Sequence, residues 1–103
     1  MVGSERRQHP RHTATWPARL WLQEMSVLAA HTLDGSRGGI RIALYSWIPT
    51  GTLSRGQVYR IEVRPDTGDR VSCVGEIRHM DSDGIGFEVP DGLPAALIPA
   101  TPA

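Results

Sequence analysis

The stretch QVYRIEVRPDTGDRVSCVGEIRHM, residues 57–80, contains two runs of alternating apolar and polar residues, joined by a short polar segment. In the first run, Tyr59, Ile61 and Val63 fall on one face. A period of two is typical of a half-buried β-strand. The joining segment RPDTGD has the Pro, Asp and Gly of a tight turn. The stretch therefore predicts an antiparallel pair of strands, over residues 57–63 and 70–80.

Similar short apolar stretches lie on either side of this hairpin. They are ARLWL (18–22), SVLAAHTL (26–33), GIRIALY (39–45) and IGFEV (85–89). In the last two, the residues expected to point inward are Ile40, Ile42, Leu44, Ile85, Phe87 and Val89. Six short strands with turn residues between most of them favour a small barrel, which leaves no open sheet edge. The predicted fold class is all-β, a six-stranded antiparallel β-barrel over residues 14–90.

The ends of the chain do not share this alternation. Residues 1–13 precede the first strand, and we expect them to form a flexible, arginine-rich arm. Residues 91–103, DGLPAALIPATPA, form a proline-rich tail. For this tail the sequence leaves two alternatives, one helical turn at residues 93–97 or disorder.

The composition indicates one globular domain. The chain has 103 residues, of which 40% are hydrophobic and 21% charged. No apolar run approaches the roughly 18 residues of a membrane span, and the N-terminus has no apolar segment typical of a secretory signal. A single cysteine, Cys73, cannot form an intramolecular disulfide. We therefore expect a cytoplasmic protein.

The net charge is zero, but the charges are distributed unequally. Residues 1–65 contain nine arginines and four acidic residues, whereas residues 66–103 contain two arginines and seven acidic residues. All eleven cationic residues are arginine and none is lysine. A coding bias would explain this preference, but arginine also offers phosphates and bases a planar fork that lysine lacks.

Part of the positive charge lies in ERRQHPRH, residues 5–12. Arg6, Arg7 and Arg11 surround Pro10, which fixes its own backbone angle and disfavours helix at His9. A solvated basic tail is the ordinary interpretation of such a segment. The alternative is a clamp for an anionic ligand.

A second polar stretch, LDGSRGG, covers residues 33–39 between two predicted strands, and we expect it to be a loop. Its glycines Gly35, Gly38 and Gly39 would permit left-handed backbone angles and close approach of a ligand. Asp34 offers a carboxylate acceptor, and Ser36 offers a hydroxyl that donates and accepts. The alternative is a glycine-rich hairpin turn in which these side chains bond only their own backbone.

The two polar stretches are chemically complementary to one kind of ligand. A carboxylate such as that of Asp34 can accept from the adjacent N1–H and N2–H donors of guanine. An arginine can form bidentate bonds to the O6/N7 edge of guanine or to phosphate oxygens, and it can stack on a purine. Together they could hold a compact molecule that carries guanines and phosphates.

At this point the sequence resembles the PilZ domain family. RQHPR fits the family's RxxxR motif through Arg7 and Arg11, and DGSRGG fits its Asp/Asn-x-Ser-x-x-Gly motif through Asp34, Ser36 and Gly39. The spacing of the motifs, the six-strand pattern and the late hairpin DSDGIGFEV also resemble a stand-alone PilZ domain.

This resemblance implies a bacterial, cytoplasmic receptor for cyclic di-GMP, with no enzymatic activity, no metal and no other cofactor. In the family, the N-terminal arginines wrap over the nucleotide, and the Asp and Ser of the second motif contact a guanine. Ordering of the arm would create a surface for a protein partner, whose identity the sequence does not reveal. The implied ligand-binding residues, with two neighbours of the motifs, are Arg6, Arg7, Arg11, Asp34, Ser36, Gly38 and Gly39.

Arg6 immediately precedes the first motif. In the family, an arginine at this position is associated with a stacked pair of nucleotides, whereas an apolar residue accompanies a single one. A pair carries four negative charges, which a third guanidinium would help to balance. We therefore expect two nucleotides per chain, with a solvated Arg6 and one nucleotide as the alternative.

Other chemistry-bearing residues give weaker signals. The histidines have no acidic or Cys partners at ligand spacing, so they do not indicate a metal site. The tryptophans could stack on guanine but are more often packing residues. Cys73 alternates with Val71 and is expected in the core. The remaining candidates for ligand contact are Trp16, Trp21, Trp47, Arg37 and Arg78.

Two other functions remain open at this stage. One is a small barrel that binds nucleic acid through the arginine arm and exposed tryptophans, although zero net charge and the lack of an evident basic face argue against it. The other is a PilZ-like adaptor without a ligand, against which the intact motifs argue.

Overall fold

The computed structural model describes residues 12–23, 25–66 and 68–98. Within these residues it contains β-strands and one short 3-10 helix. They are β1 (His12–Thr13), β2 (Pro17–Gln23), β3 (Ser26–Ser36), β4 (Gly39–Leu44), β5 (Val58–Val63), β6 (Val71–Asp81), β7 (Gly84–Glu88) and η2 (Ala95–Leu97).

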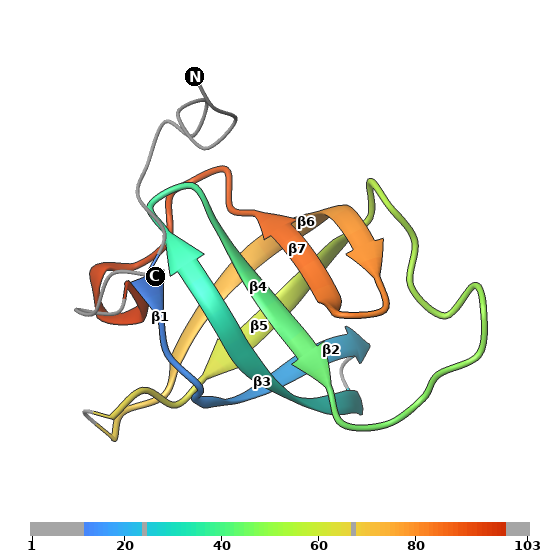
Figure 1. The fold of residues 1–103 in the computed structure, drawn as a ribbon, viewed down its shortest axis with the longest axis horizontal. Coiled ribbons are helices and arrows are strands. Elements are labelled where there is room, and N and C mark those ends of the chain that lie inside the picture. The colour runs from blue at the N-terminus through green and yellow to red at the C-terminus, as the bar shows by residue number, and fades with distance from the viewer. Residues whose placement is uncertain (1–11, 24, 67, 99–103) are drawn as a thin grey trace.

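Strands β2 to β7 form a closed antiparallel barrel (Figure 1). The strand order is β1-β3-β2-β5-β6-β7-β4, and an additional pairing of β3 with β4 completes the ring. The predicted six-stranded antiparallel barrel is therefore confirmed, and each predicted strand corresponds to one of β2–β7 within a few residues. Strand β1 is an added two-residue strand that pairs with the end of β3.

The interior of the barrel is filled by alternate side chains of its strands. The predicted inward residues Ile40, Ile42, Ile61 and Val63 are at most 1% exposed. Burying each such side chain stabilises the fold by about 1.5–3 kcal/mol. The buried apolar core consists of Ala18, Leu20, Ala30, Ile40, Ile42, Leu53, Ile61, Val63, Ile77, Ile85, Phe87, Val89, Leu93 and Leu97.

The stretch at residues 33–39 is not the loop that its composition suggests. Strand β3 continues through Ser36 and β4 begins at Gly39, so only Arg37 and Gly38 form the turn. Gly35, Gly38 and Gly39 are not among the glycines with positive φ. The expectation of left-handed angles was wrong, because Gly35 and Gly39 are held in the β3–β4 ladder and Gly38 forms the turn without a positive φ. Gly39 serves close packing instead, since a Cβ there would lie 2.4 Å from the carbonyl oxygen of Phe87.

The tail contains the expected single helical turn, the 3-10 helix η2. Leu93 and Leu97 are buried and belong to the core, so this segment closes one end of the barrel. Gly92 has a φ of 85°, a left-handed conformation that glycine adopts without strain. Residues 99–103 lie outside the described part of the chain.

The longest connection between strands is the segment from residue 45 to residue 57, between β4 and β5. It forms the wide excursion at the right of Figure 1. Leu53 anchors its middle in the core, with 4% of its surface exposed. The carbonyl of Pro49 accepts hydrogen bonds from the backbone N–H and the hydroxyl of Thr52. The amide of Gly56 donates to the carbonyl of Ile77 on β6.

Candidate functional site

The last residue of the first polar stretch, His12, lies at the end of strand β3 that carries the second stretch. Strand β1 pairs antiparallel with β3 so that His12 lies opposite Gly35 and Thr13 opposite Asp34. Arg11, which lies outside the described residues, is bonded directly to His12. The chain therefore enters the barrel beside the Asp/Ser/Gly motif, although about twenty residues separate the two stretches in sequence.

Thr32 fastens this point of entry. Its hydroxyl donates to the carbonyl of Ala14 and accepts a hydrogen bond of 2.8 Å from the backbone N–H of Trp16. Its own backbone N–H donates to the carbonyl of Trp16 at 2.9 Å. Thr32 is 3% exposed, so these bonds are protected from water. These bonds hold the backbone of residues 14–16 against β3.

Asp34 lies two residues after Thr32 on the same strand. A bulge in the pairing of β3 with β4 lies between Thr32 and Asp34. Arg41 is the direct cross-strand partner of Asp34, and its guanidinium lies 3.3 Å from the Oδ2 atom of the carboxylate. The side chains of Arg41 and Asp34 are 34% and 14% exposed. The pair combines an oriented acceptor with a partly accessible cation.

Arg41 was missed as a site residue by the sequence analysis, although a signal for it existed. A hairpin with a two-residue turn at residues 37–38 places residue 34 opposite residue 41. Because a loop was expected over residues 33–39, the pairing of residue 34 with residue 41 was not predicted.

Two of the motif residues, Ser36 and Gly39, are less accessible than Asp34. Ser36 is 4% exposed and pairs with Gly39, which is also buried. Gly38 lies in the turn and is half-buried, and Arg37 beside it is exposed. Arg6, Arg7 and Arg11 lie outside the described residues. The structure thus brings Asp34 and Arg41 together at the surface, with Ser36 and Gly39 forming their support.

The C-terminal segment packs over the same hairpin. The amide of Val89 donates to the carbonyl of Gly38 at 2.9 Å, and the amide of Leu93 donates to the carbonyl of Arg37 at 2.7 Å. A Cβ at Gly35 would lie 3.1 Å from Leu93. The segment treated as a tail is therefore part of the support of the site. Its sequence signal was the pair of leucines at positions 93 and 97, four residues apart.

Among the weaker candidates, Arg78 and Trp21 have side-chain partners of their own, and Trp47 lies on another segment. Arg78 forms ion pairs with Glu76 and Glu88 at 3.2 and 3.4 Å. The guanidinium of Arg60 lies 4.6 Å from the ring of Trp21. Trp47 is 85% exposed on the segment after β4. Trp16 is partly buried against the core.

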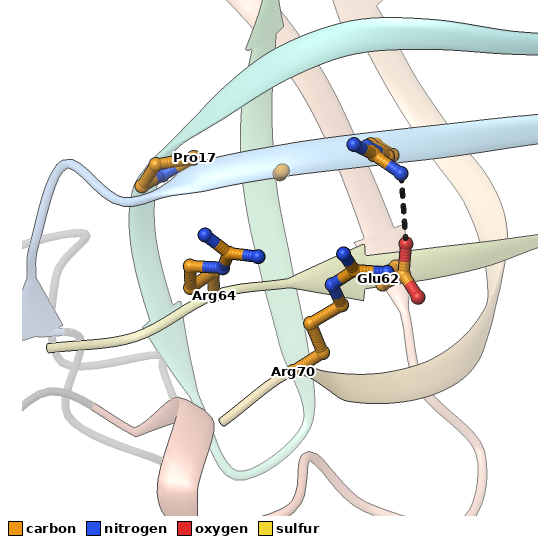
Figure 2. Close-up of a pocket in the computed structure, with 6 residues that line it drawn as sticks. Pro17, Glu62, Arg64 and Arg70 are labelled. Atoms are coloured by element: carbon orange, nitrogen blue, oxygen red, sulfur yellow. Dashed lines mark ion pairs between the residues drawn. The ribbon is translucent and has the colours of Figure 1, made fainter. Parts of the chain in front are cut away.

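A separate arginine-lined cleft lies beside the start of β2 (Figure 2). Arg19, Arg64 and Arg70 surround one carboxylate, that of Glu62, and the nearest ion-pair distance is 3.9 Å, from Arg19. The cleft has a volume of about 160 Å³. Pockets for small organic ligands usually measure roughly 300–1,000 Å³. This cleft therefore has the size and charge for a single oxyanion rather than for a nucleotide.

Metal and thiol chemistry find little support in the described part of the chain. No group of three or more His, Cys, Asp and Glu residues there could hold a metal ion. Cys73 is half-buried against the core, and burial raises the pKa of its thiol to about 11. No helix in the described ranges has the length and apolar character needed to cross a membrane.

Comparison with known proteins places the chain beside one family and a solved structure of the same fold. The family model described as "PilZ domain" matches residues 5–98. Among solved structures, the Bacillus subtilis inhibitor of motility MotI/DgrA superposes with a TM-score of 0.68 at 19% identity. That alignment covers 89% of this chain and 46% of MotI/DgrA, so the chain spans about half the length of that protein. At this identity the likeness concerns the fold. No curated protein matches the chain.

Proposed function

The chain belongs to the PilZ domain family, and from this premise we propose that it is a cyclic di-GMP receptor that passes the signal to a protein partner. PilZ domains act by binding and as adaptors, so the proposed activity is recognition rather than catalysis. The proposed ligand-binding residues are those of the two motifs, with Arg41 added.

The observation that carries this proposal is the ladder between β1 and β3. It brings the residue that follows Arg11 opposite Gly35, next to Asp34. A ligand bound at Asp34 would therefore lie within reach of the arginines that precede His12. Neither motif alone could surround a cyclic dinucleotide.

The chemistry of these groups suits the two parts of the ligand. The carboxylate of Asp34 would accept from the N1–H and N2–H donors of a guanine, while Arg41 keeps it oriented. Arg7 and Arg11 would bind phosphate oxygens through bidentate, charge-assisted hydrogen bonds. The bound arm would then offer a new surface to a partner.

Calorimetry with cyclic di-GMP tests the proposal. We expect saturable binding, weakened at least tenfold by Arg7→Ala or Arg11→Ala, since charge-assisted bonds contribute about 1.5–3 kcal/mol each. Asp34→Ala should weaken binding and narrow the preference for cyclic di-GMP over cyclic di-AMP. Asp66→Ala, an exposed position on the turn after β5, is the matched control and should bind normally.

Thermal unfolding distinguishes this receptor from a nucleic-acid-binding barrel. Cyclic di-GMP should raise the melting temperature, because a ligand that binds only the folded state stabilises it by about 2.7 kcal/mol at a hundredfold excess over the Kd. An oligonucleotide with the same number of phosphates should have no effect. The reverse result would refute the receptor.

The stoichiometry tests the role proposed for Arg6. We expect two nucleotides per chain in the unmodified protein, and Arg6→Leu should lower the ratio toward one while the barrel remains folded. A third guanidinium near the ligand would otherwise have no charge to balance. A ratio of one at saturation in the unmodified protein would remove Arg6 from the site.

A further inference from the structure

The second surface of interest lies at the other end of strand β4, away from the Asp34 hairpin. Here a cavity of about 320 Å³ opens between the segment that follows β4 and the turn that joins β6 to β7. We call it the Trp47 surface. Its lining includes Trp47, Leu53, Met80, Asp81, Asp83 and Ile85.

The Trp47 surface has a buried apolar floor and an exposed apolar rim. Leu53 and Ile85 are 4% and 7% exposed, whereas Trp47 and Met80 are 85% and 39% exposed. A tryptophan can bury roughly 150–250 Å² when it packs, so leaving one in water forgoes a large hydrophobic gain. Aromatic residues and methionine beside a cavity are typical of the centre of a protein interface.

The charge on this surface is negative. Its lining includes Asp81 and Asp83 and contains no arginine, lysine or histidine. Asp81 is engaged, because its Oδ2 lies 2.8 Å from His79 Nε2 and its Oδ1 accepts from the amides of Asp83 and Gly84. The carboxylate of Asp83 has no ion pair or hydrogen bond to any residue that the structure describes. It remains able to receive a cation.

We propose that the Trp47 surface docks a protein partner through a segment that carries one large apolar side chain flanked by arginine or lysine. The apolar side chain would enter the cavity beside Trp47, over the floor made by Leu53 and Ile85. The flanking cation would pair with Asp83. The apolar floor and the negative rim disfavour nucleic acid, whose phosphates Asp83 would repel.

Two other occupants fit less well. The chain's own arm is cationic, but the only aliphatic side chains of residues 1–11 that could fill the cavity are those of Met1 and Val2. A second copy of the chain would have to supply an apolar residue next to a cation on an accessible surface. The clearest group of cations outside the arm, Arg19, Arg64 and Arg70, lines a narrow cleft with Glu62.

The Trp47 surface also has a position suited to signal output. Leu44 contributes to its lining and lies three residues after Arg41 on the same strand. The docking proposal rests on the proposed function, because a receptor that is not an enzyme needs a partner to act upon. Its test does not require the nucleotide. A chain that fails to bind cyclic di-GMP could still bind the partner, and a chain that binds cyclic di-GMP could still fail to bind the partner.

The test is a selection of random 12-residue displayed peptides on the full chain, without nucleotide. We expect the selected peptides to share one Trp, Phe or Leu flanked by Arg or Lys. Trp47→Ser should weaken their binding at least tenfold, and the chain should remain folded because this side chain is exposed. Val74→Ser, which removes another exposed apolar side chain on β6, is the matched control and should leave binding unchanged.

Charge reversal gives the second readout. With Asp83→Arg, the same selection should enrich acidic residues around the apolar position. Failure to enrich any peptide, equal binding by the Trp47→Ser chain, or no change of preference with Asp83→Arg would overturn the proposal. Two further results would also overturn it. Peptide binding that rises when residues 1–11 are deleted would show that the chain's own arm occupies the surface, and a dimer that Trp47→Ser dissociates would show that a second copy does.

Discussion

The two ends of strand β4 differ in how they are covered. At its start, Gly39 and Arg41 lie between β3 and β7, and the C-terminal segment caps the adjoining turn. At its end, the chain leaves the sheet and exposes Tyr45 and Trp47. The backbone at the first end is held on both sides, which suits a site for a small ligand. The second is suited to contact with a macromolecule, because apolar area is already available there.

The largest expected effect breaks the close packing at the first end. Gly39→Ala should lower the free energy of unfolding by about 3 kcal/mol, because the added Cβ meets the backbone of β7 and forces the strands apart. Gly51→Ala, at the second end, should lower the free energy of unfolding by only about 1 kcal/mol. The added Cβ would meet no atom there, and the only cost is that alanine adopts the φ of 92° less readily than glycine.

Urea unfolding measures both variants. Gly86→Ala is the control within the sheet, because its nearest neighbour would lie at an ordinary 3.6 Å. It should be neutral or slightly stabilising. Equal losses for the Gly39 and Gly51 variants would mean that the two ends are equally tolerant, contrary to the comparison.

A pair of threonines gives an intermediate effect. Thr32→Val should lower the free energy of unfolding by about 2 kcal/mol, because the buried N–H of Trp16 loses its hydroxyl partner. Thr52→Val removes an exposed hydroxyl bond to Pro49 and should cost less than about 0.5 kcal/mol. The Thr32 variant should also bind cyclic di-GMP more weakly, since the base of the arm is loosened. If both variants unfold alike, Thr32 does not fasten the arm.

The smallest effect concerns the turn beside the Trp47 surface. The ion-paired hydrogen bond from His79, followed by the backbone N–H of Asp83, lowers the pKa of Asp81 from its ordinary value. The charged form is therefore the stabilising one. Its contribution is complete above the unfolded pKa of about 3.9 and is lost as the pH falls through the lower folded pKa.

An NMR titration from pH 6 to pH 2 checks this effect. The amide signal of Gly84, which donates to Asp81, should shift as the pH falls through the lowered pKa of Asp81, and Asp81→Asn should remove that part of the shift. Amides at the Asp34 hairpin that move in step with it would show that the two ends titrate together.

The sequence predicted the strands because their signal is local. Alternation in QVYRIEV and GIRIALY assigned Ile61, Val63, Ile40 and Ile42 to the interior, and each is buried. The turn at residues 64–69 was also predicted from its Pro, Asp and Gly, whereas for residues 93–97 the sequence left a helical turn and disorder as alternatives. The family resemblance came from two short motifs and is confirmed by the match over residues 5–98.

The sequence by itself determined where the six barrel strands lie to within a few residues, which of their faces point inward and which motifs are present, because these properties depend on neighbours a few positions apart. Only the tertiary structure decided the pairing of β1 with the end of β3, the burial of Ser36 and Gly39, and the exposure of Trp47. Those features depend on barrel closure and on the packing of the C-terminal segment. They join residues far apart in the chain, whose separation in space no local pattern records.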